Sequence, residues 1–305
     1  MQMQNSSMPE GENRTDNARG FLYALGGTLL VSTNYITAKY GLKGFNPEMF
    51  SLIWTAAASC YAFAVVVISG KLKELSLPRG SVWGIMTLGV ATGAGMILGW
   101  SGLSLLDPAF ASFIWRFSPV LIILLSVSLL GERLRLIEVL PMVLMVAGGA
   151  LTTLGRWQIV GTGVVLTLLA CAAVAVQMIV VKKIVGSVHP NILVFYRVFL
   201  AFLVIGIWTV ARGRLTAGVS PPHLLVTMLG AFLGPCASFL LTFRSYRYWP
   251  LSRSSILLTA QPLIVLPMAY IAFGKIPSGL ELTGGVVILS GALLLVWLHR
   301  AQVLQ

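Results

Sequence analysis

The amino-acid sequence predicts an all-α polytopic membrane protein with ten transmembrane helices, arranged as two inverted five-helix repeats. Three observations lead to this prediction. Of the 305 residues, 57% are hydrophobic and only 10% are charged, whereas a soluble domain has about 45–50% and about 25%. Ten apolar stretches are long enough to cross a bilayer, which takes roughly 20 residues each. A single offset then relates the first five stretches to the last five.

The ten stretches are separated by short polar connections. They cover residues 20–38, 48–69, 82–103, 108–130, 136–154, 159–181, 191–211, 224–246, 254–273 and 280–298. We interpret the first as a mature helix and not as a signal peptide, because it has no clear small-residue cleavage site. Residues 1–18 are polar and predict a flexible tail.

The repeat appears when the sequence is shifted by 143 residues without gaps. The shift pairs prolines, glycines and polar residues at span boundaries: Lys39 with Lys182, Pro47 with Pro190, Ser112 with Ser255, Pro119 with Pro262, Gly131 with Gly274, Glu138 with Glu281, and Gly148 with Gly291. The predicted units are 19–155 and 156–305. Because each contains an odd number of spans, the second enters the membrane upside down, which favours alternating access between two conformations.

The distribution of Lys and Arg predicts the orientation of the chain. The short loops on the side of both termini carry 13 of them, against 6 on the opposite side. The positive-inside rule therefore places both termini in the cytoplasm, with the protein in the inner (plasma) membrane. The net charge is +12, and the charged residues lie mainly in the connections between apolar runs. We therefore expect them to face lipid headgroups and not nucleic acid.

Ten spans in two halves, with Gly131-Glu132 closing the fourth span and Glu138 opening the fifth, resemble the drug/metabolite transporter superfamily and its EamA-type exporters. The second half departs from that family's pattern, because Gly274-Lys275 replaces a frequent Gly-Glu pair. The tryptophan-rich spans are similar to those of aromatic amino-acid exporters. The resemblance implies export of small amphipathic metabolites, with aromatic or large neutral amino acids as leading candidates. A multidrug or nucleobase exporter and a non-transporting receptor are the alternatives.

Polar side chains inside the spans are the first candidates for substrate binding, because such residues usually face a bundle interior or cavity. Arg116 lies about 12 Å into its span, and it could hold a carboxylate through two hydrogen bonds. Arg197 could do the same from the cytoplasmic half. The alternative for each arginine is contact with a headgroup or a helix-end carbonyl. Asn34 and the repeat-related Gln177 could bind a zwitterion or simply join helices.

The remaining candidates flank prolines or are aromatic. Ser118 and Gln261 each precede a proline that we expect inside a helix, and these prolines, Pro119 and Pro262, are predicted hinges. Aromatic rings could stack on a flat substrate, or they could belong to the interfacial belt. The aromatic substrate-binding candidates are Trp54, Tyr61, Trp100, Trp115 and Tyr196.

The sequence lacks carboxylates deep in the spans and recognisable catalytic or metal-binding motifs. No Asp or Glu lies near the centre of a span, which predicts transport without a deep carboxylate proton relay. We find no Walker loop, nucleophile elbow or metal-ligand spacing. We therefore expect that the protein is not an enzyme and has no catalytic residue, cofactor or metal. A monomer and a homodimer both fit the sequence. Gly148-Gly149 and Gly284-Gly285 predict smooth helix faces that either pack together or form a dimer contact.

Overall fold

The computed structural model describes residues 10–303 apart from 131–135, 154–156, 185–186, 217, 219, 246–247, 249–256, 258–260 and 275–276. This part of the chain is helical with short turns and contains no strand. The longer helices are α1 (Glu10–Gly41), α2 (Pro47–Ile68), α3 (Val82–Leu105), α4 (Pro108–Ile114), α5 (Ser118–Leu130), α6 (Leu136–Thr153), α7 (Trp157–Ile184), α8 (Pro190–Ala211), α9 (Pro221–Ala231), α10 (Phe239–Ser245), α12 (Gln261–Phe273) and α13 (Gly279–Val303).

The helices confirm the predicted all-α membrane fold. The fourth predicted span is α4, the short turn η3 (Trp115–Phe117) and α5, and the eighth is α9, the wide turn η4 (Phe232–Ser238) and α10. Within the described residues, five stretches are long and apolar enough to cross a membrane alone: Pro47–Ile68, Arg79–Leu105, Val160–Val181, Pro190–Ala211 and Pro221–Thr242. Shorter apolar helices include Val139–Thr152, Gln261–Phe273 and Gly279–Leu294.

The repeat is visible in how equivalent helices begin and end. Helices α2 and α8 have the same length and are related by the 143-residue offset at both ends. The side chain of Asn46 accepts a hydrogen bond from the first turn of α2, and that of His189 does so for α8. Gly70 (φ +68°) and Gly213 (φ +60°) follow the two helices in the left-handed conformation that favours glycine. Repeat-related residues therefore cap the start and follow the end of equivalent helices.

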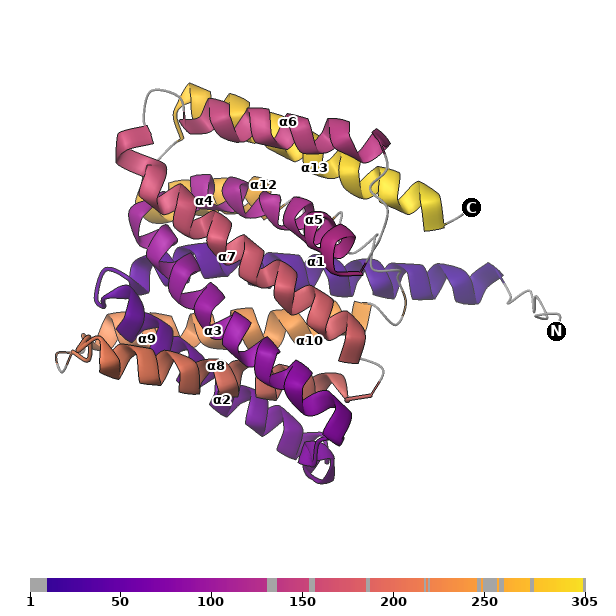
Figure 1. Ribbon diagram of the computed structural model, residues 1–305, viewed down its shortest axis with the longest axis vertical. Helices are drawn as coiled ribbons and strands as arrows, with labels where there is room; N and C mark the ends of the chain where they lie inside the picture. The colour runs from indigo at the N-terminus through magenta and orange to yellow at the C-terminus, as the bar shows by residue number, and fades with distance from the viewer. Residues whose placement is uncertain are drawn as a thin grey trace.

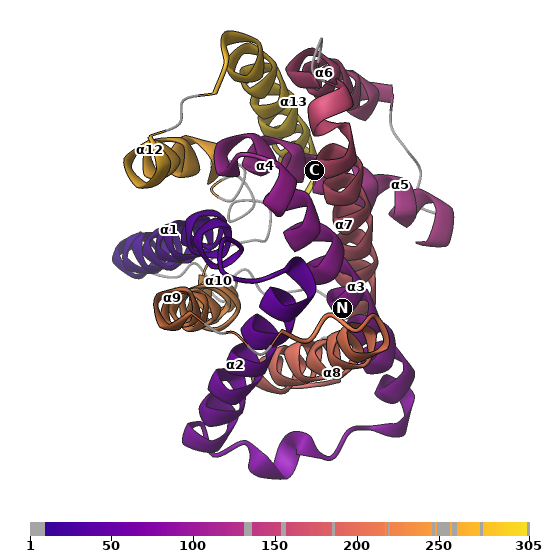
Figure 2. The same cartoon turned by 90° about the vertical axis from the view of Figure 1, so that its left-hand side faces the viewer.

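The two halves are inverted and interlocked. In Figure 1, α1 and α7 run in opposite directions, whereas the beginning of α1 and the end of α13 lie on the same side. Most main neighbours come from opposite halves: α3 packs on α7, α1 on α9 and α10, α2 on α8, and α6 on α13. Figure 2 views this bundle nearly end-on. Any movement of one half against the other must therefore repack the interior.

The smooth glycine faces of α6 and α13 pack against each other within one chain. A Cβ atom at Gly148 would lie 2.7 Å from the carbonyl oxygen of Gly284, and one at Gly284 would lie 2.6 Å from that of Gly148. Such close backbone approach is possible only without side chains. Of the two predicted uses of these glycines, internal packing is the one that the structure shows.

Two spans are interrupted near prolines. Pro119 is the second residue of α5, which directly follows the tight turn η3. It therefore lies at a break between two helices and not, as expected from the sequence, inside a regular helix. For Pro262 the expectation stays a prediction, because residues 258–260, which precede α12, lie outside the described residues. The break in the fourth span comes just before Pro119, at η3. In the eighth span, Pro235 lies within the wide π-helical turn η4, a feature that often marks functional sites.

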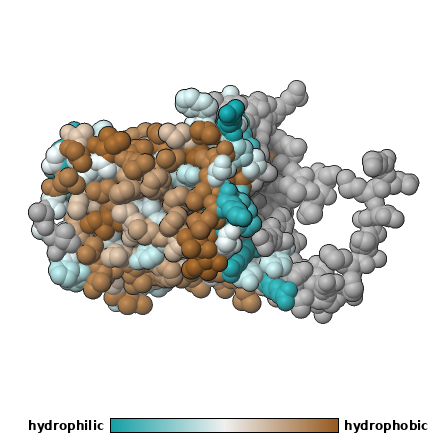
Figure 3. Space-filling model, turned by 90° about the horizontal axis from the view of Figure 1, so that it is seen from below, coloured by the Kyte–Doolittle hydropathy of each residue, from teal (hydrophilic) through white to brown (hydrophobic). Residues whose placement is uncertain are grey.

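The outer surface is apolar around the middle of the bundle. Figure 3 shows hydrophobic residues over most of the visible face and hydrophilic residues gathered mainly toward the side of the termini. Ile68, Trp83 and Ile271 are each more than four-fifths exposed. Exposed apolar area on this scale is typical of a surface that lipid covers.

Candidate functional site: a cavity between the two halves

A cavity of about 150 Å³ lies where both halves meet. An engineered cavity of roughly this volume holds one benzene molecule, so there is space for a single aromatic ring. The cavity is bounded by α1, α2, α3, α7 and α8 together with the interruptions η3 and η4. It brings together six of the predicted substrate-binding residues, namely Asn34, Trp54, Trp100, Trp115, Gln177 and Arg197.

Other lining residues went unrecognised as site residues in the sequence. Gly95 and Gly99 lie four residues apart on α3, a spacing that lets another helix or side chain approach closely. At Gly99, a Cβ atom would lie 2.9 Å from the Trp115 ring. Pro235 has a sequence signal, since it is a proline inside an apolar span. Phe239 has none. The complete set of additional lining residues is Thr92, Gly95, Met96, Gly99, Val174, Pro235 and Phe239.

Arg197 is the cation of the cavity. It lies about 10 Å along α8 from the helix start, and its guanidinium stacks over the ring of Phe239 at 4.1 Å from the centroid. A desolvated cation–π contact contributes about 2 kcal/mol, less than the cost of keeping an arginine inside a membrane. Its Nε atom is buried and has no hydrogen-bond partner among the described residues. A guanidinium in this setting is suited to binding a carboxylate through its N–H groups.

The two repeat-related amides differ in their contacts. Gln177 is 5% exposed, and its Nε2 donates to the carbonyl oxygen of Ala91 at 3.3 Å. The Oδ1 atom of Asn34 is buried but has no partner among the described residues. The Asn34 amide lies directly against Gly234 on the wide turn, so closely that a Cβ atom there would overlap it. Gln177 therefore joins α7 to α3, while the buried acceptor of Asn34 is not used by the described part of the chain.

An aromatic cluster closes one end of the cavity. Phe50, Trp54 and Trp100 pack with ring centroids 5.1–5.5 Å apart, and Trp54 is only 1% exposed. Phe50 and Trp54 belong to the first two turns of α2, which begins on the side away from the termini (Figure 1). The Nε1 atom of Trp100 is buried, and no described residue accepts a hydrogen bond from it. This aromatic wall offers flat apolar area and one N–H donor.

The polar atoms of the cavity form an unbalanced set. Among the described residues that line it, Arg197 alone is charged, and no Asp or Glu is present. Three buried polar atoms without protein partners belong to lining residues: Asn34 Oδ1, Trp100 Nε1 and Arg197 Nε. Leaving such an atom unsatisfied costs about 1–3 kcal/mol. A ligand that supplies their partners would recover this free energy.

Arg116, the other predicted carboxylate ligand, is not among the residues that line the cavity. Its Nη2 donates to Gln261 Oε1 at 2.6 Å, and its Nε donates to the carbonyl oxygen of Ser112 at 3.3 Å. The first bond joins η3 of one half to α12 of the other. These contacts agree with the alternative interpretation, in which Arg116 binds a helix-end carbonyl.

The remaining candidates also lie outside the cavity lining. The ring of Tyr61 meets Phe232 edge-on, at 5.4 Å between centroids. Ser118 Oγ donates to the carbonyl oxygen of Trp115, and Tyr196 Oη donates to that of Leu75, both at 2.9 Å. Substrate binding by these residues, and by Arg116 and Gln261, stays a prediction.

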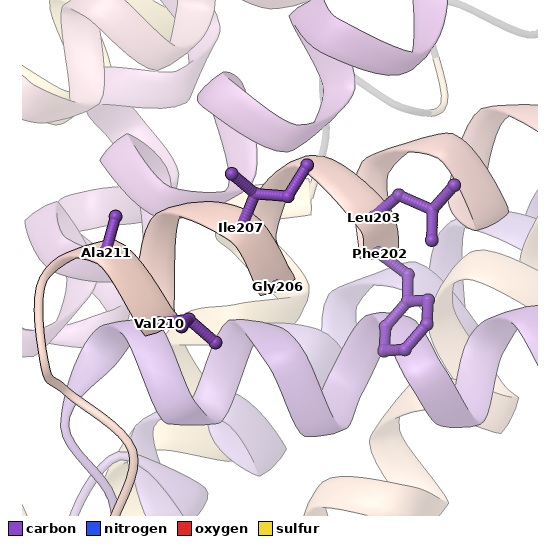
Figure 4. Close-up of a pocket in the computed structure, with 6 residues that line it drawn as sticks. All are labelled: Phe202, Leu203, Gly206, Ile207, Val210 and Ala211. Atoms are coloured by element: carbon purple, nitrogen blue, oxygen red, sulfur yellow. The ribbon is translucent and has the colours of Figure 1, made fainter.

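A larger hollow of about 540 Å³ lies on the outside of α8. Figure 4 shows that a single helix supplies its lining, which is entirely apolar: Phe202, Leu203, Gly206, Ile207, Val210 and Ala211. Ile207 is 72% exposed. With no polar group to orient a substrate, this hollow is a surface suited to lipid acyl chains and not a second candidate site.

Two inverted helical halves around a cavity that combines apolar walls with one cation and a few polar groups define a membrane transporter. The EamA-like transporter family model matches residues 18–154 and again 161–297. The chain therefore belongs to the EamA-like transporter family, within the drug/metabolite transporter superfamily.

Two further proteins are similar to this chain, one in sequence and one in fold. An "Uncharacterized transporter in cobO 3'region" from Sinorhizobium sp. is 29% identical over 130 residues, which are 42% of this chain and 92% of that protein. A solved crystal structure of a protein superposes with a TM-score of 0.65 at 18% identity, covering 93% of this chain and 99% of the other. The likeness to this crystal structure concerns the fold alone. The family and the Sinorhizobium protein support a non-enzymatic membrane transporter.

Proposed function

We propose that the protein exports small amphipathic metabolites across the inner membrane, with aromatic or large neutral amino acids as the first candidates. One observation carries this proposal: a ring-sized cavity combines three tryptophans with a cation and buried, unpartnered polar atoms. Arg197 would hold the substrate carboxylate, Asn34 would accept from a polar hydrogen, and Trp54, Trp100 and Trp115 would surround the flat side chain.

Transport by this site requires the two halves, 19–155 and 156–305, to rock about the cavity with both termini in the cytoplasm. The supporting observation is that the cavity lies between the halves and is lined by both. The helix breaks at η3 and η4 border it. Pro119 and Pro262, at the starts of α5 and α12, are the proposed hinge residues.

The proposed transport needs no proton relay in the cavity. No carboxylate is found among the described lining residues, and intramembrane Asp or Glu residues are the usual proton carriers. We therefore propose facilitated diffusion, driven by the substrate gradient alone.

Counterflow of labelled phenylalanine into liposomes that contain the purified protein tests this function. We expect saturable accumulation that an imposed pH gradient does not alter. Strict dependence on the gradient would refute facilitated diffusion. If drugs or nucleobases are transported but phenylalanine is not, the protein is a multidrug or nucleobase exporter. If no solute is transported, a non-transporting receptor is favoured.

A further inference from the structure

We infer that the cavity recognises the carboxylate and the ring of its substrate but not the ammonium group, so that an aromatic 2-hydroxy acid binds better than the corresponding amino acid. The inference rests on the proposed function in one respect, that this cavity is the transport site. It names the substrate class which the polar atoms of that site complement.

The charge of the cavity is the first argument. Arg197 supplies one positive charge, and the described lining contains no negative one. A monoanion therefore neutralises the site, whereas a zwitterion brings an ammonium group that finds no counter-ion. Burying an ammonium without a counter-ion costs far more than burying a neutral hydroxyl.

The hydrogen-bond inventory is the second argument. Two of the unpartnered buried atoms, Arg197 Nε and Trp100 Nε1, carry donors, whereas Asn34 Oδ1 is an acceptor. A 2-hydroxy acid supplies carboxylate oxygens for the donors and a single hydroxyl hydrogen for the acceptor. An ammonium has three hydrogens and no lone pair, so it can satisfy neither buried donor and pairs with only one of the three unpartnered buried atoms.

The aromatic rings do not replace the missing counter-ion. Trp54 and Trp100 pack against each other and against Phe50, so much of their ring area is already in contact. Phe239 presents its face to the Arg197 guanidinium, and an ammonium there would meet a second cation. Cation–π binding of an ammonium requires an open ring face close to it.

Equilibrium binding of four related ligands to the purified full-length protein tests the inference. The probes are 3-phenyllactate, 3-phenylpropionate, phenylalanine and phenethylamine, which share a phenyl ring. We expect phenyllactate to bind tightest, about threefold or more better than phenylalanine, since only the ammonium is desolvated unpaired. Phenethylamine should bind most weakly. Tighter binding of phenylalanine or phenethylamine, or no binding by any probe, would overturn the inference.

A variant pair isolates the donor in the aromatic wall. Trp100→Phe keeps a ring and removes Nε1–H, and we expect it to weaken phenyllactate about three- to tenfold without changing phenethylamine binding. Trp83→Phe, at an 82% exposed position, is the matched control and should change neither. Equal losses for both ligands, or none, would contradict the assignment of Trp100.

Failure of the inference and failure of the proposed function give different results. Tight phenyllactate binding without flux in liposomes would reject transport but support the ligand preference. Phenylalanine flux with tighter phenylalanine binding would support transport and reject the preference.

Discussion

Arg116 and Arg197 lie inside spans of the same protein, yet their surroundings differ. Arg116 donates to a side chain of the opposite half, Gln261, and to a backbone carbonyl. Arg197 lies over the Phe239 ring, lines the cavity and has a buried Nε without a partner in the described part of the chain. The residue type is identical, but the Nε of Arg116 has a backbone partner, whereas that of Arg197 has none among the described residues.

The difference separates two uses of a membrane-embedded cation. An arginine with protein partners contributes to stability and to the alignment of helices, because its removal leaves those partners unsatisfied. An arginine without them costs free energy that only a bound anion recovers. We therefore expect variants at Arg197 to act on ligand affinity and variants at Arg116 to act on stability.

The largest expected effect comes from Arg197→Gln. Losing a charge-assisted hydrogen bond of about 1.5–3 kcal/mol should lower the affinity for phenyllactate by about ten- to a hundredfold. Phenethylamine, which has no carboxylate, should bind as before. Equilibrium dialysis of both ligands measures the ratio, and a parallel loss for the two would remove Arg197 from the carboxylate site.

Gly234→Ala should act on the same site indirectly. Its Cβ atom would overlap the amide of Asn34, and overpacking of this kind costs about 1–3 kcal/mol. We expect weaker phenyllactate binding together with a lower Tm.

Two further variants test whether that loss comes from the overlap with Asn34. Adding Asn34→Ala to Gly234→Ala removes the clash and should restore part of the Tm, although not the affinity. Gly80→Ala is the matched control, since nothing lies within 4 Å of its Cβ position. No recovery of Tm in the double variant would mean that the steric explanation is wrong.

The sequence predicted most of the fold because membrane helices are specified locally. Asn46 and Pro47 mark the start of α2, and their repeat-related residues mark the start of α8. Length and hydropathy then fix where a span lies, and the odd number of spans fixes the inversion. None of these signals depends on how the helices rotate about their axes.

The site was predicted less well because it depends on that rotation. The turn η3 follows α4 and contains Arg116, so a regular helix is a poor guide to the direction of its side chain. The wide turn η4 likewise changes the register that leads to Phe239, which no sequence pattern marked. Arg197 stands in the uninterrupted helix α8, but the partner of its guanidinium comes from another span. The sequence could therefore name both arginines without telling them apart.

A double-mutant cycle measures the contact that defines Arg116. Arg116→Met, Gln261→Leu and the double variant should give a coupling free energy of about 1 kcal/mol, the scale found for polar contacts between membrane helices. The single variants should lower the stability, and the ratio of phenyllactate to phenethylamine affinity should stay unchanged. If Arg116→Met changes that affinity ratio, Arg116 contacts the substrate after all.

The smallest effect is expected where a cation and its partner are both exposed. Lys71 and Glu74 form an ion pair of 2.6 Å on the loop after α2. The hydrogen bond from Lys71 is the main cause that lowers the pKa of Glu74 below its usual value of 4.5. Because the folded-state pKa is the lower one, the pair stabilises the fold above pH 4.5, and this contribution is lost as the pH falls below that value.

Glu74→Gln should therefore leave ligand binding and the Tm at pH 7 nearly unchanged, since water and salt screen exposed pairs. It should only flatten the fall of the Tm with pH below about 4.5. A loss at pH 7 as large as that of Arg116→Met would contradict the argument that a position inside a membrane span, and not charge alone, makes the two arginines matter.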